Sequence, residues 1–511
     1  MRTNYSVKNS LTAIISNLII FFIAFIAQAI FIRILGAEYL GLNGLFSNII
    51  TILSIFELGI GNAIVFNLYK PIAENDTEKI NSLMSFYKRA YNMIAFLIFI
   101  FGILLMPFLK YIVGDISIDI NIYLVYFLFI LSTVSSYLMI YKRNLIIATQ
   151  RNYIINIVHM IYLIILNFSQ LLILFLTKNY YLYLIIKIAL QFVENFVITY
   201  IASKLYPNIN IFNAKKLDKE TEEDIFNRVK ALVFHKVGTV IINGTDNILI
   251  SHFLGIIQVG LYSNYYTVIN AINMIFSQVI SSTTASVGNL LITESKDKIF
   301  DTFKKIRFLN FWIACFTGVC LLVLLQPFIS IWVGEQYLLE FSVVCVLVFN
   351  YYQKMMRNSY STFKDSGGIW IEDRYVPLIE SILNIFFSIL FLKLFGLVGV
   401  FIGTIFSGLA LWLYSYPKFV YKNLFGRKYK DYFKETFGYI FLFFIICFIV
   451  YSITSKVNLN NLILQILLNL IICIIVPNFI LVVIFRKSSN FKYFMTLLNK
   501  ILSRIKNVIK R

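Results

Sequence analysis

Three charged side chains lie inside apolar runs that are long enough to cross a bilayer: Glu57, Lys236 and Asp246. A charge at the centre of a bilayer costs about 3 kcal/mol on insertion scales, so each of these residues is expected to face protein or water. A lysine in a water-filled cavity suits a phosphate, and a carboxylate there can couple a proton or a sodium ion. The favoured interpretation of all three is therefore functional rather than structural.

Two further charges, Lys187 and Glu194, are seven residues apart and so lie on one face of a helix. A structural ion pair and a place in the binding site explain them about equally well. Arg33 lies at the outer end of its run, where snorkelling to the interface also explains it. His159 stands alone in its run and is expected to be a satisfied core residue.

Amides and hydroxyls accompany these charges, and together with nearby tyrosines they suit the hydroxyl groups of a sugar. For the isolated hydroxyls, hydrogen bonding between neighbouring helices is the favoured interpretation. The candidate cavity and substrate-binding residues are Lys236, Asn243, Asn270, Asn273, Lys187 and Arg33, and the candidate ion-coupling residues are Glu57, Asp246 and Glu194.

The remaining charges predict how the chain crosses the membrane. Of the 45 Lys and Arg residues, 38 fall into eight short polar stretches that alternate with apolar runs. Because positive charge is held on the cytoplasmic side, this alternation predicts an all-α polytopic membrane protein with about 14 transmembrane helices and both termini in the cytoplasm. The predicted spans lie near 11–33, 42–67, 90–110, 122–141, 154–177, 180–203, 232–254, 261–292, 308–333, 341–360, 375–394, 397–417, 437–455 and 462–485.

The composition agrees with a membrane protein. Hydrophobic residues make up 59% of the chain and charged residues only 14%, compared with roughly 25% charged in soluble domains. A soluble fold of this length could not bury so much apolar surface. The net charge of +20 does not indicate nucleic acid, because the basic residues flank apolar runs and form no continuous face.

A glycine motif occurs twice and indicates an internal repeat. Leu-Gly, four residues and Gly-Leu occupy 35–42 and again 254–261, an offset of 219 residues. Each copy lies between the first and second helices of a unit of six predicted helices, so both units have one orientation, with a cleft between them. Thr221 and Asp224 resemble a capping box and predict a short surface helix in the linker. The predicted parts are 1–204, an N-terminal six-helix lobe; 205–231, a cytoplasmic linker; 232–422, a C-terminal six-helix lobe; 423–485, two additional transmembrane helices; and 486–511, a basic amphipathic cytoplasmic tail.

The sequence contains no catalytic or metal-binding constellation. It has no GxxxxGK[ST], HExxH or GxSxG motif, and its five cysteines form no CxxC pair. Membrane polymerases and ligases of lipid-linked glycans need a sizeable outer loop for catalysis, and the predicted outer turns are too short to build one. We therefore expect no enzyme, no metal and no cofactor, with a proton or sodium gradient as the candidate driving force.

Three segments near the N-terminus carry a resemblance to a known family. These are RILGAEYLGLNGLF at 33–46, ILSIFELGIG at 52–61 and LYKPIAE at 68–74. They resemble the polysaccharide flippases of the multidrug/oligosaccharidyl-lipid/polysaccharide (MOP) exporter superfamily, which transport capsule, exopolysaccharide and O-antigen repeat units. The motif covers residues 30–90, and beyond it the resemblance rests on the helix count and the two-lobe plan.

The resemblance implies a substrate, a mechanism and a location. The substrate would be an oligosaccharide on undecaprenyl pyrophosphate, moved to the outer leaflet of the bacterial cytoplasmic membrane as the two lobes alternate access. By position, Lys236, Lys187 and Arg33 could meet the pyrophosphate, while the three acidic candidates could couple an ion. Glycosyltransferases and a polymerase of the same pathway are the partners it implies.

Three alternatives stay open. A lipid II flippase of the same superfamily is the nearest. A drug/cation antiporter is the next, although such a protein would normally have twelve helices. A membrane polysaccharide polymerase or ligase is the alternative from another class, and a large outer loop with essential Arg or His residues would favour it.

Overall fold

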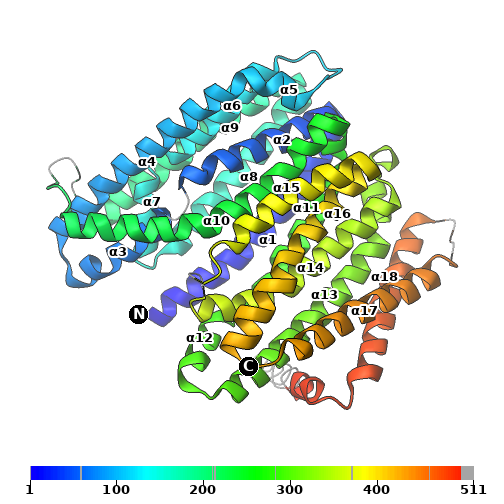
Figure 1. Cartoon of the computed structure of the whole chain (residues 1–511). Coiled ribbons are helices and arrows are strands. Elements are labelled where there is room, and N and C mark those ends of the chain that lie inside the picture. The colour runs from blue at the N-terminus through cyan, green and yellow to red at the C-terminus, as the bar shows by residue number, and fades with distance from the viewer. Residues whose placement is uncertain are drawn as a thin grey trace, which may run out of the picture. The chain divides into compact units, whose positions relative to one another are not determined.

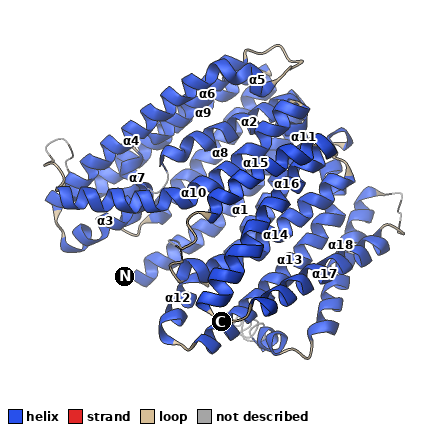
Figure 2. Cartoon of the chain, in the orientation of Figure 1, coloured by secondary structure: helices blue, strands red, loops and turns tan. Residues whose placement is uncertain are grey.

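The computed structural model describes residues 2–57, 60–209, 211, 214–281, 283–369, 372–457, 459 and 461–496. Within these ranges every regular element is a helix, as Figures 1 and 2 show. The all-α prediction is therefore confirmed.

The chain divides into two compact units, Met1–Ser263 and Asn264–Arg511. The sequence predicted this division in the linker 205–231. In the structure, the helix that follows the linker packs with the first unit rather than the second. The prediction of two six-helix transport lobes concerns movement and stays a prediction. The first unit contains α1 (Arg2–Leu35), α2 (Ala37–Leu53), a 3-10 turn (Ser54–Glu57), α3 (Ile60–Glu74), α4 (Thr77–Leu105), α5 (Leu109–Val113), α6 (Ile122–Tyr137), α7 (Ile140–Ala148), α8 (Asn152–Thr177), α9 (Tyr180–Leu205), α10 (Lys219–Leu254) and the start of α11 (Ile256–Ser281).

The second unit contains the rest of α11 and the helices that follow it. Within this unit α13 packs on α14, α17 and α18, and α15 packs closely on α16. Its helices are α12 (Thr284–Thr293), α13 (Lys296–Trp332), α14 (Phe341–Ser366), α15 (Val376–Phe395), α16 (Leu397–Leu409), a π-helical continuation (Ala410–Leu424), α17 (Tyr429–Thr454) and α18 (Leu462–Phe485).

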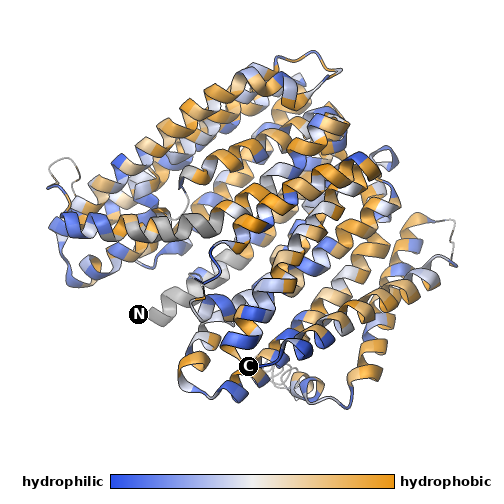
Figure 3. Ribbon diagram, viewed as in Figure 1, coloured by the Kyte–Doolittle hydropathy of each residue, from blue (hydrophilic) through white to orange (hydrophobic). Residues whose placement is uncertain are grey.

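Ten of the described helices are long and apolar enough to cross a membrane, and the bent pair α6–α7 makes an eleventh candidate. Figure 3 shows apolar residues along most of α4 and α6, with hydrophilic residues near the helix ends. Three predicted spans are not among these candidates. The span at 42–67 is broken after Leu53, and those at 232–254 and 341–360 lie in the more polar α10 and α14. The polytopic membrane fold is thus confirmed, with fewer clear spans than the 14 expected.

In two of the predicted spans the α-helix is interrupted. The first break separates α2 from α3 and contains the 3-10 turn that ends at Glu57. The second separates α6 from α7, where Leu138 is extended and Met139 has a left-handed φ of 68°. The two helices there meet at a bend of 41°. Broken helices inside membranes are tolerated where protein or a cavity satisfies the exposed backbone groups.

The repeated glycine motif has the same local structure in both copies. Gly36 and Gly255 each hold a positive φ, 95° and 91°, where the chain turns between two helices. A Cβ on Gly41 would lie 2.2 Å from the carbonyl oxygen of Ile256, and a Cβ on Gly260 would lie 2.1 Å from that of Ala37. These contacts are reciprocal, because Ile256 is the repeat equivalent of Ala37. Glycine is therefore required where α2 and the start of α11 meet within the first unit.

Candidate functional site

The most enclosed charge of the first unit is Glu194 on α9, whose side chain is 1% exposed. Its carboxylate accepts hydrogen bonds from Arg143 on α7 at 2.8 Å, from His159 on α8 at 2.9 Å and from Gln191 at 2.9 Å. Three helices are joined by this one carboxylate. The prediction that His159 is satisfied agrees with this contact, but its side chain is 43% exposed and so is not a core residue.

Of the two interpretations of Lys187 and Glu194, the ion pair between them is not formed, because Glu194 pairs with Arg143 and His159. Seven residues along a helix amount to a rise of about 10 Å, which is too far for a direct contact between the two side chains. The ammonium group of Lys187 instead lies over the ring of Phe129 on α6, 5.6 Å from its centroid. Among the described residues Lys187 has no carboxylate within ion-pair distance.

Glu57 lies at one of the helix breaks and contacts the other. Its carboxylate accepts a hydrogen bond of 2.7 Å from the hydroxyl of Tyr137, the last residue of α6. The ring of Tyr137 stacks on that of Tyr91 at 6.4 Å, and the Tyr91 hydroxyl accepts from Asn144 on α7 at 3.1 Å. A continuous row of polar groups therefore links the two broken spans, beginning at an acid that could couple an ion.

The candidates on α10 and α11 are only partly described. The side chains of Lys236 and Asn243 lie outside the described residues. A carboxylate oxygen of Asp246 is buried with no hydrogen-bond partner among the described groups, and so is the carbonyl oxygen of the Asn273 side chain. Asn270 lies near the sulfur of Met274 at 3.8 Å.

Arg33, the remaining candidate, is exposed near the end of α1. Among the described side chains, no hydrogen bond or ion pair joins two members of the predicted set. Instead, the neighbours that the structure gives them are residues the sequence did not single out, such as Arg143 and Tyr137.

The second unit holds a charged cluster that sequence reasoning missed. Arg357 on α14 donates to Glu380 on α15 at 2.8 Å, and Lys354 lies one turn earlier on the same helix. The charge pattern of the sequence assigns both cations to a basic cytoplasmic stretch, although they also lie in the last turns of the predicted span 341–360. Glu380 was the available signal, since it is a carboxylate inside the predicted span 375–394.

Another arginine of the second unit is fully enclosed. Arg307 on α13 is 1% exposed and donates to Glu435 at 2.7 Å, to the Tyr421 hydroxyl at 2.6 Å and to Thr436 at 2.9 Å. Its guanidinium also lies 5.4 Å from the centroid of the Tyr360 ring. These contacts fasten α13 to α17, and they give Arg307 a structural role.

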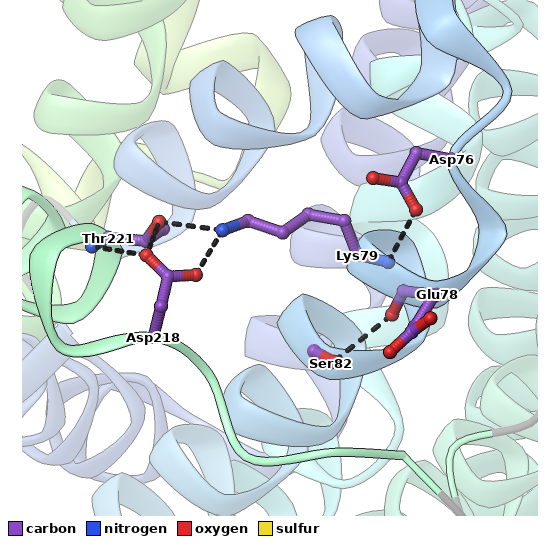
Figure 4. Close-up of polar contacts among 6 residues, drawn as sticks. All are labelled: Asp76, Glu78, Lys79, Ser82, Asp218 and Thr221. Carbon is purple, nitrogen blue, oxygen red and sulfur yellow. Dashed lines mark hydrogen bonds and ion pairs between the residues drawn. The ribbon is translucent and has the colours of Figure 1, made fainter.

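A clasp on the first unit ties the linker to the turn between α3 and α4, as Figure 4 shows. Lys79 on α4 pairs with Asp218 and donates to Thr221 at 2.9 Å, while Lys215 pairs with Glu78 at 2.6 Å. The hydrogen bonds from Lys79 and Thr221 hold the pKa of Asp218 below its usual value. The predicted short surface helix is in fact the first part of α10, which has Asp218 as its N-cap.

The comparisons with known proteins show the family of this chain and its fold. The profile of a family described as polysaccharide biosynthesis protein matches residues 6–285. A search of curated proteins found no matching sequence.

Solved structures share the fold over most of their length. A structure described as lipid II flippase MurJ in an inward closed conformation has a TM-score of 0.64 at 16% identity, covering 94% of this chain and 99% of that one. A multidrug resistance MATE family transporter of the MOP superfamily, in an inward-facing conformation, has a TM-score of 0.54 at 14% identity, covering 76% and 91%. The MATE multidrug transporter DinF-BH has a TM-score of 0.55 at 15% identity, covering 83% and 97%.

Proposed function

Because this chain belongs to the polysaccharide biosynthesis protein family, we propose that it is a flippase for oligosaccharide repeat units carried on undecaprenyl pyrophosphate. It moves them across the bacterial cytoplasmic membrane for capsule or exopolysaccharide assembly. It is a transporter and not an enzyme, and both of its termini lie in the cytoplasm. Glycosyltransferases that build the repeat unit act before it, and a polymerase acts after it.

The placement of charge inside the membrane-spanning part of the chain carries this proposal. Lys187 and Glu194 lie in α9, one of the candidate membrane spans. Glu57 contacts α6 of the bent candidate pair, and Arg357 contacts the candidate span α15. A simple anchor would have no use for such groups, which are costly in hydrocarbon and mark substrate or ion pathways. A flippase for a charged lipid headgroup does need them.

The likeness to MurJ supports the class of substrate. That protein is described as a lipid II flippase, and its structure is covered over 99% of its length. A lipid-linked oligosaccharide shares with lipid II an isoprenoid tail, a phosphate linkage and a sugar headgroup. We infer that Lys187 and Lys236 contact the phosphates and that Glu57, Asp246 or Glu194 couples a proton or sodium ion while the two lobes alternate access.

The test is complementation of a strain that lacks this gene. Glu57→Gln and Lys236→Ala should abolish surface polysaccharide, and lipid-linked repeat units should accumulate on the inner leaflet. The matched control is Glu74→Gln, which removes a carboxylate from an exposed pair with Lys70. Protein level in the membrane should be unchanged in all three variants. Normal polysaccharide in the deletion strain would reject the proposed function.

The same strain separates the alternatives. If the protein were a lipid II flippase, deleting its gene should stop growth and not only polysaccharide export. Loss of a drug antiporter should raise drug sensitivity and leave polysaccharide intact. Loss of a polymerase should leave single repeat units on the outer leaflet, whereas loss of the flippase should leave them on the inner one.

A further inference from the structure

The cluster on α14 has hydrogen-bond donors that the protein itself does not use. Arg357 gives one nitrogen to Glu380, but its Nε is buried with no hydrogen-bond partner among the described groups. The Lys354 side chain is exposed on the same helix and has no carboxylate within ion-pair distance among the described residues. The cluster therefore holds two cations against one anion.

The position of Arg357 is built by two neighbouring helices. Glu380 on α15 is 7% exposed and fixes one end of the guanidinium. On α16, a Cβ at Gly408 would lie 2.4 Å from another guanidinium nitrogen, so any side chain there would displace it. Both contacts hold an arginine that is itself 24% exposed. A side chain held in place while it still reaches solvent is prepared for a ligand rather than for packing.

The face of α14 around these cations is polar. Asn350 precedes Lys354 by four residues, and Asn358 follows it by four, so all three lie along one side of the helix. Asn350 donates to the backbone oxygen of Phe401 at 2.9 Å. This side cannot face hydrocarbon, because the ammonium group of Lys354 would be left without water or a counter-charge there.

The depth of the cluster suits a lipid headgroup. Glu380 is four residues from the start of α15, about 6 Å along the helix, and its partner Arg357 lies at a similar depth. Lys354 lies about one turn of α14 deeper than Arg357. The cations therefore lie about 6–10 Å inside the start of α15, compared with about 15 Å from the edge of the hydrocarbon to its centre. Exposed apolar residues begin at Tyr375 and Ile379, where α15 enters lipid.

We propose that Lys354 and Arg357 form a phosphate-binding station for the diphosphate of the lipid carrier at the cytoplasmic end of the second unit. The inference rests on the proposed function for the identity of the carrier and for the orientation of α14. The guanidinium of Arg357 contacts one phosphate through paired N–H groups, which match its planar geometry. Lys354 adds a point charge, and the net charge of the cluster draws the diphosphate from the inner leaflet.

The test measures lipid binding by the purified full-length protein in nanodiscs of zwitterionic phosphatidylcholine. Undecaprenyl pyrophosphate is the probe, and undecaprenol, which lacks the phosphates, is the reference ligand. Lys354→Gln and Arg357→Gln should each weaken binding of the probe at least tenfold and leave binding of undecaprenol unchanged. Arg357→Lys should lose part of the affinity, since it keeps the charge without the planar fork.

Two further variants separate the station from general effects. Gly408→Ala should weaken binding of the probe by displacing Arg357, although it changes no charge. The control is Lys430→Gln, an exposed cytoplasmic lysine whose loss lowers the net charge equally and should have no effect. The proposal is overturned if the wild type and both Gln variants bind the probe with equal affinity. It is also overturned if the Gln variants lose as much affinity for undecaprenol as for the probe.

Two other outcomes also decide against the proposal. Absence of probe binding by the wild-type protein would overturn it. Displacement of the probe by an equal amount of phosphatidylglycerol would assign the cations to ordinary anionic lipid instead. The proposed function is tested separately by surface polysaccharide in the deletion strain, so one can fail while the other holds.

Discussion

Each compact unit contains an arginine–glutamate pair that joins two of its helices, and the two pairs are completed differently. In the first unit Arg143 on α7 pairs with Glu194 on α9; in the second Arg357 on α14 pairs with Glu380 on α15, both at 2.8 Å. The two arginines are 24% exposed in each case. The geometry of the pair itself therefore does not distinguish the two units.

The difference lies in which partner is saturated. Glu194 accepts two further hydrogen bonds, from His159 and Gln191, so the network of the first unit is organised around its acid. In the second unit the extra group is Lys354, and positive charge is left over. The first network is a closed structural junction of three helices, whereas the second keeps donors for something that is not part of the protein.

The largest expected effect concerns stability in the first unit. Arg143→Gln removes the main cation from a carboxylate that is 1% exposed. Breaking a buried pair costs 3–5 kcal/mol, and because Arg143 is partly exposed we expect about 2–4 kcal/mol. The double variant Arg143→Gln/Glu194→Gln should recover most of this, because it leaves no uncompensated charge. Thermal melting of the purified protein measures both, and a double variant no more stable than the single one would contradict the interpretation.

The second unit should respond differently to the same pair of changes. Arg357→Gln/Glu380→Gln should melt close to the wild type, yet surface polysaccharide should fall at least tenfold, because the guanidinium that binds the carrier is gone. The corresponding double variant of the first unit is compared by thermal melting alone, because Glu194 is a candidate for ion coupling. If the double variant of the second unit exports normally, the contrast between the units fails.

The sequence predicted the membrane fold well, because the apolar runs that form spans are local features. It could not predict the partners of Glu194, since Arg143 and His159 lie 51 and 35 residues away along the chain. It also missed both helix breaks. Hydropathy stays high through residues 54–57 and 138–139, and the backbone conformation there depends on packing rather than on composition.

The cluster of Lys354 and Arg357 shows a different limit. The alternation of charge assigns basic groups near a predicted boundary to the cytoplasm, although Lys354 and Arg357 lie inside the predicted span 341–360. The rule therefore hides basic residues that lie inside a predicted span. The glycine motif was informative for the opposite reason: its spacing indicated a repeat, and only glycine permits the reciprocal contact that the structure shows.

The third prediction concerns the repeated glycine motif, where the two copies have the same local structure. Gly41→Ala and Gly260→Ala should each destabilise the protein by about 1–2 kcal/mol, because the added methyl group meets a backbone oxygen that cannot turn away. The two effects should be equal within error, since the contacts are reciprocal. The matched control is Gly288→Ala on α12, where a Cβ meets nothing within 4 Å and alanine favours the helix. Unequal effects in thermal melting would show that the repeats differ here as well.

The smallest effect is expected at the clasp of Figure 4, where charge is paired but exposed. Asp218 is 49% exposed, and exposed pairs contribute at most about 1 kcal/mol. Asp218→Asn removes the pair with Lys79 but keeps a good N-cap for α10, whereas Asp218→Ala removes both. We therefore expect hydrogen exchange in the first turn of α10 to rise slightly in the Asn variant and clearly in the Ala variant.

The pH dependence of the clasp follows from the direction of one pKa. The pKa of Asp218 is lower in the folded protein than its usual value near 3.9, because Lys79 and Thr221 donate hydrogen bonds to the carboxylate. A carboxyl with a lowered folded pKa adds stability above the unfolded pKa and loses it as the pH falls through the folded value. Protection of the first turn should thus be constant above about pH 5 and decline below pH 4 in the wild type only. A decline of the same size in the Asn variant would mean that another group titrates. Exposure alone would then not explain why the Asp218–Lys79 pair contributes less stability than the two more enclosed arginine–glutamate pairs.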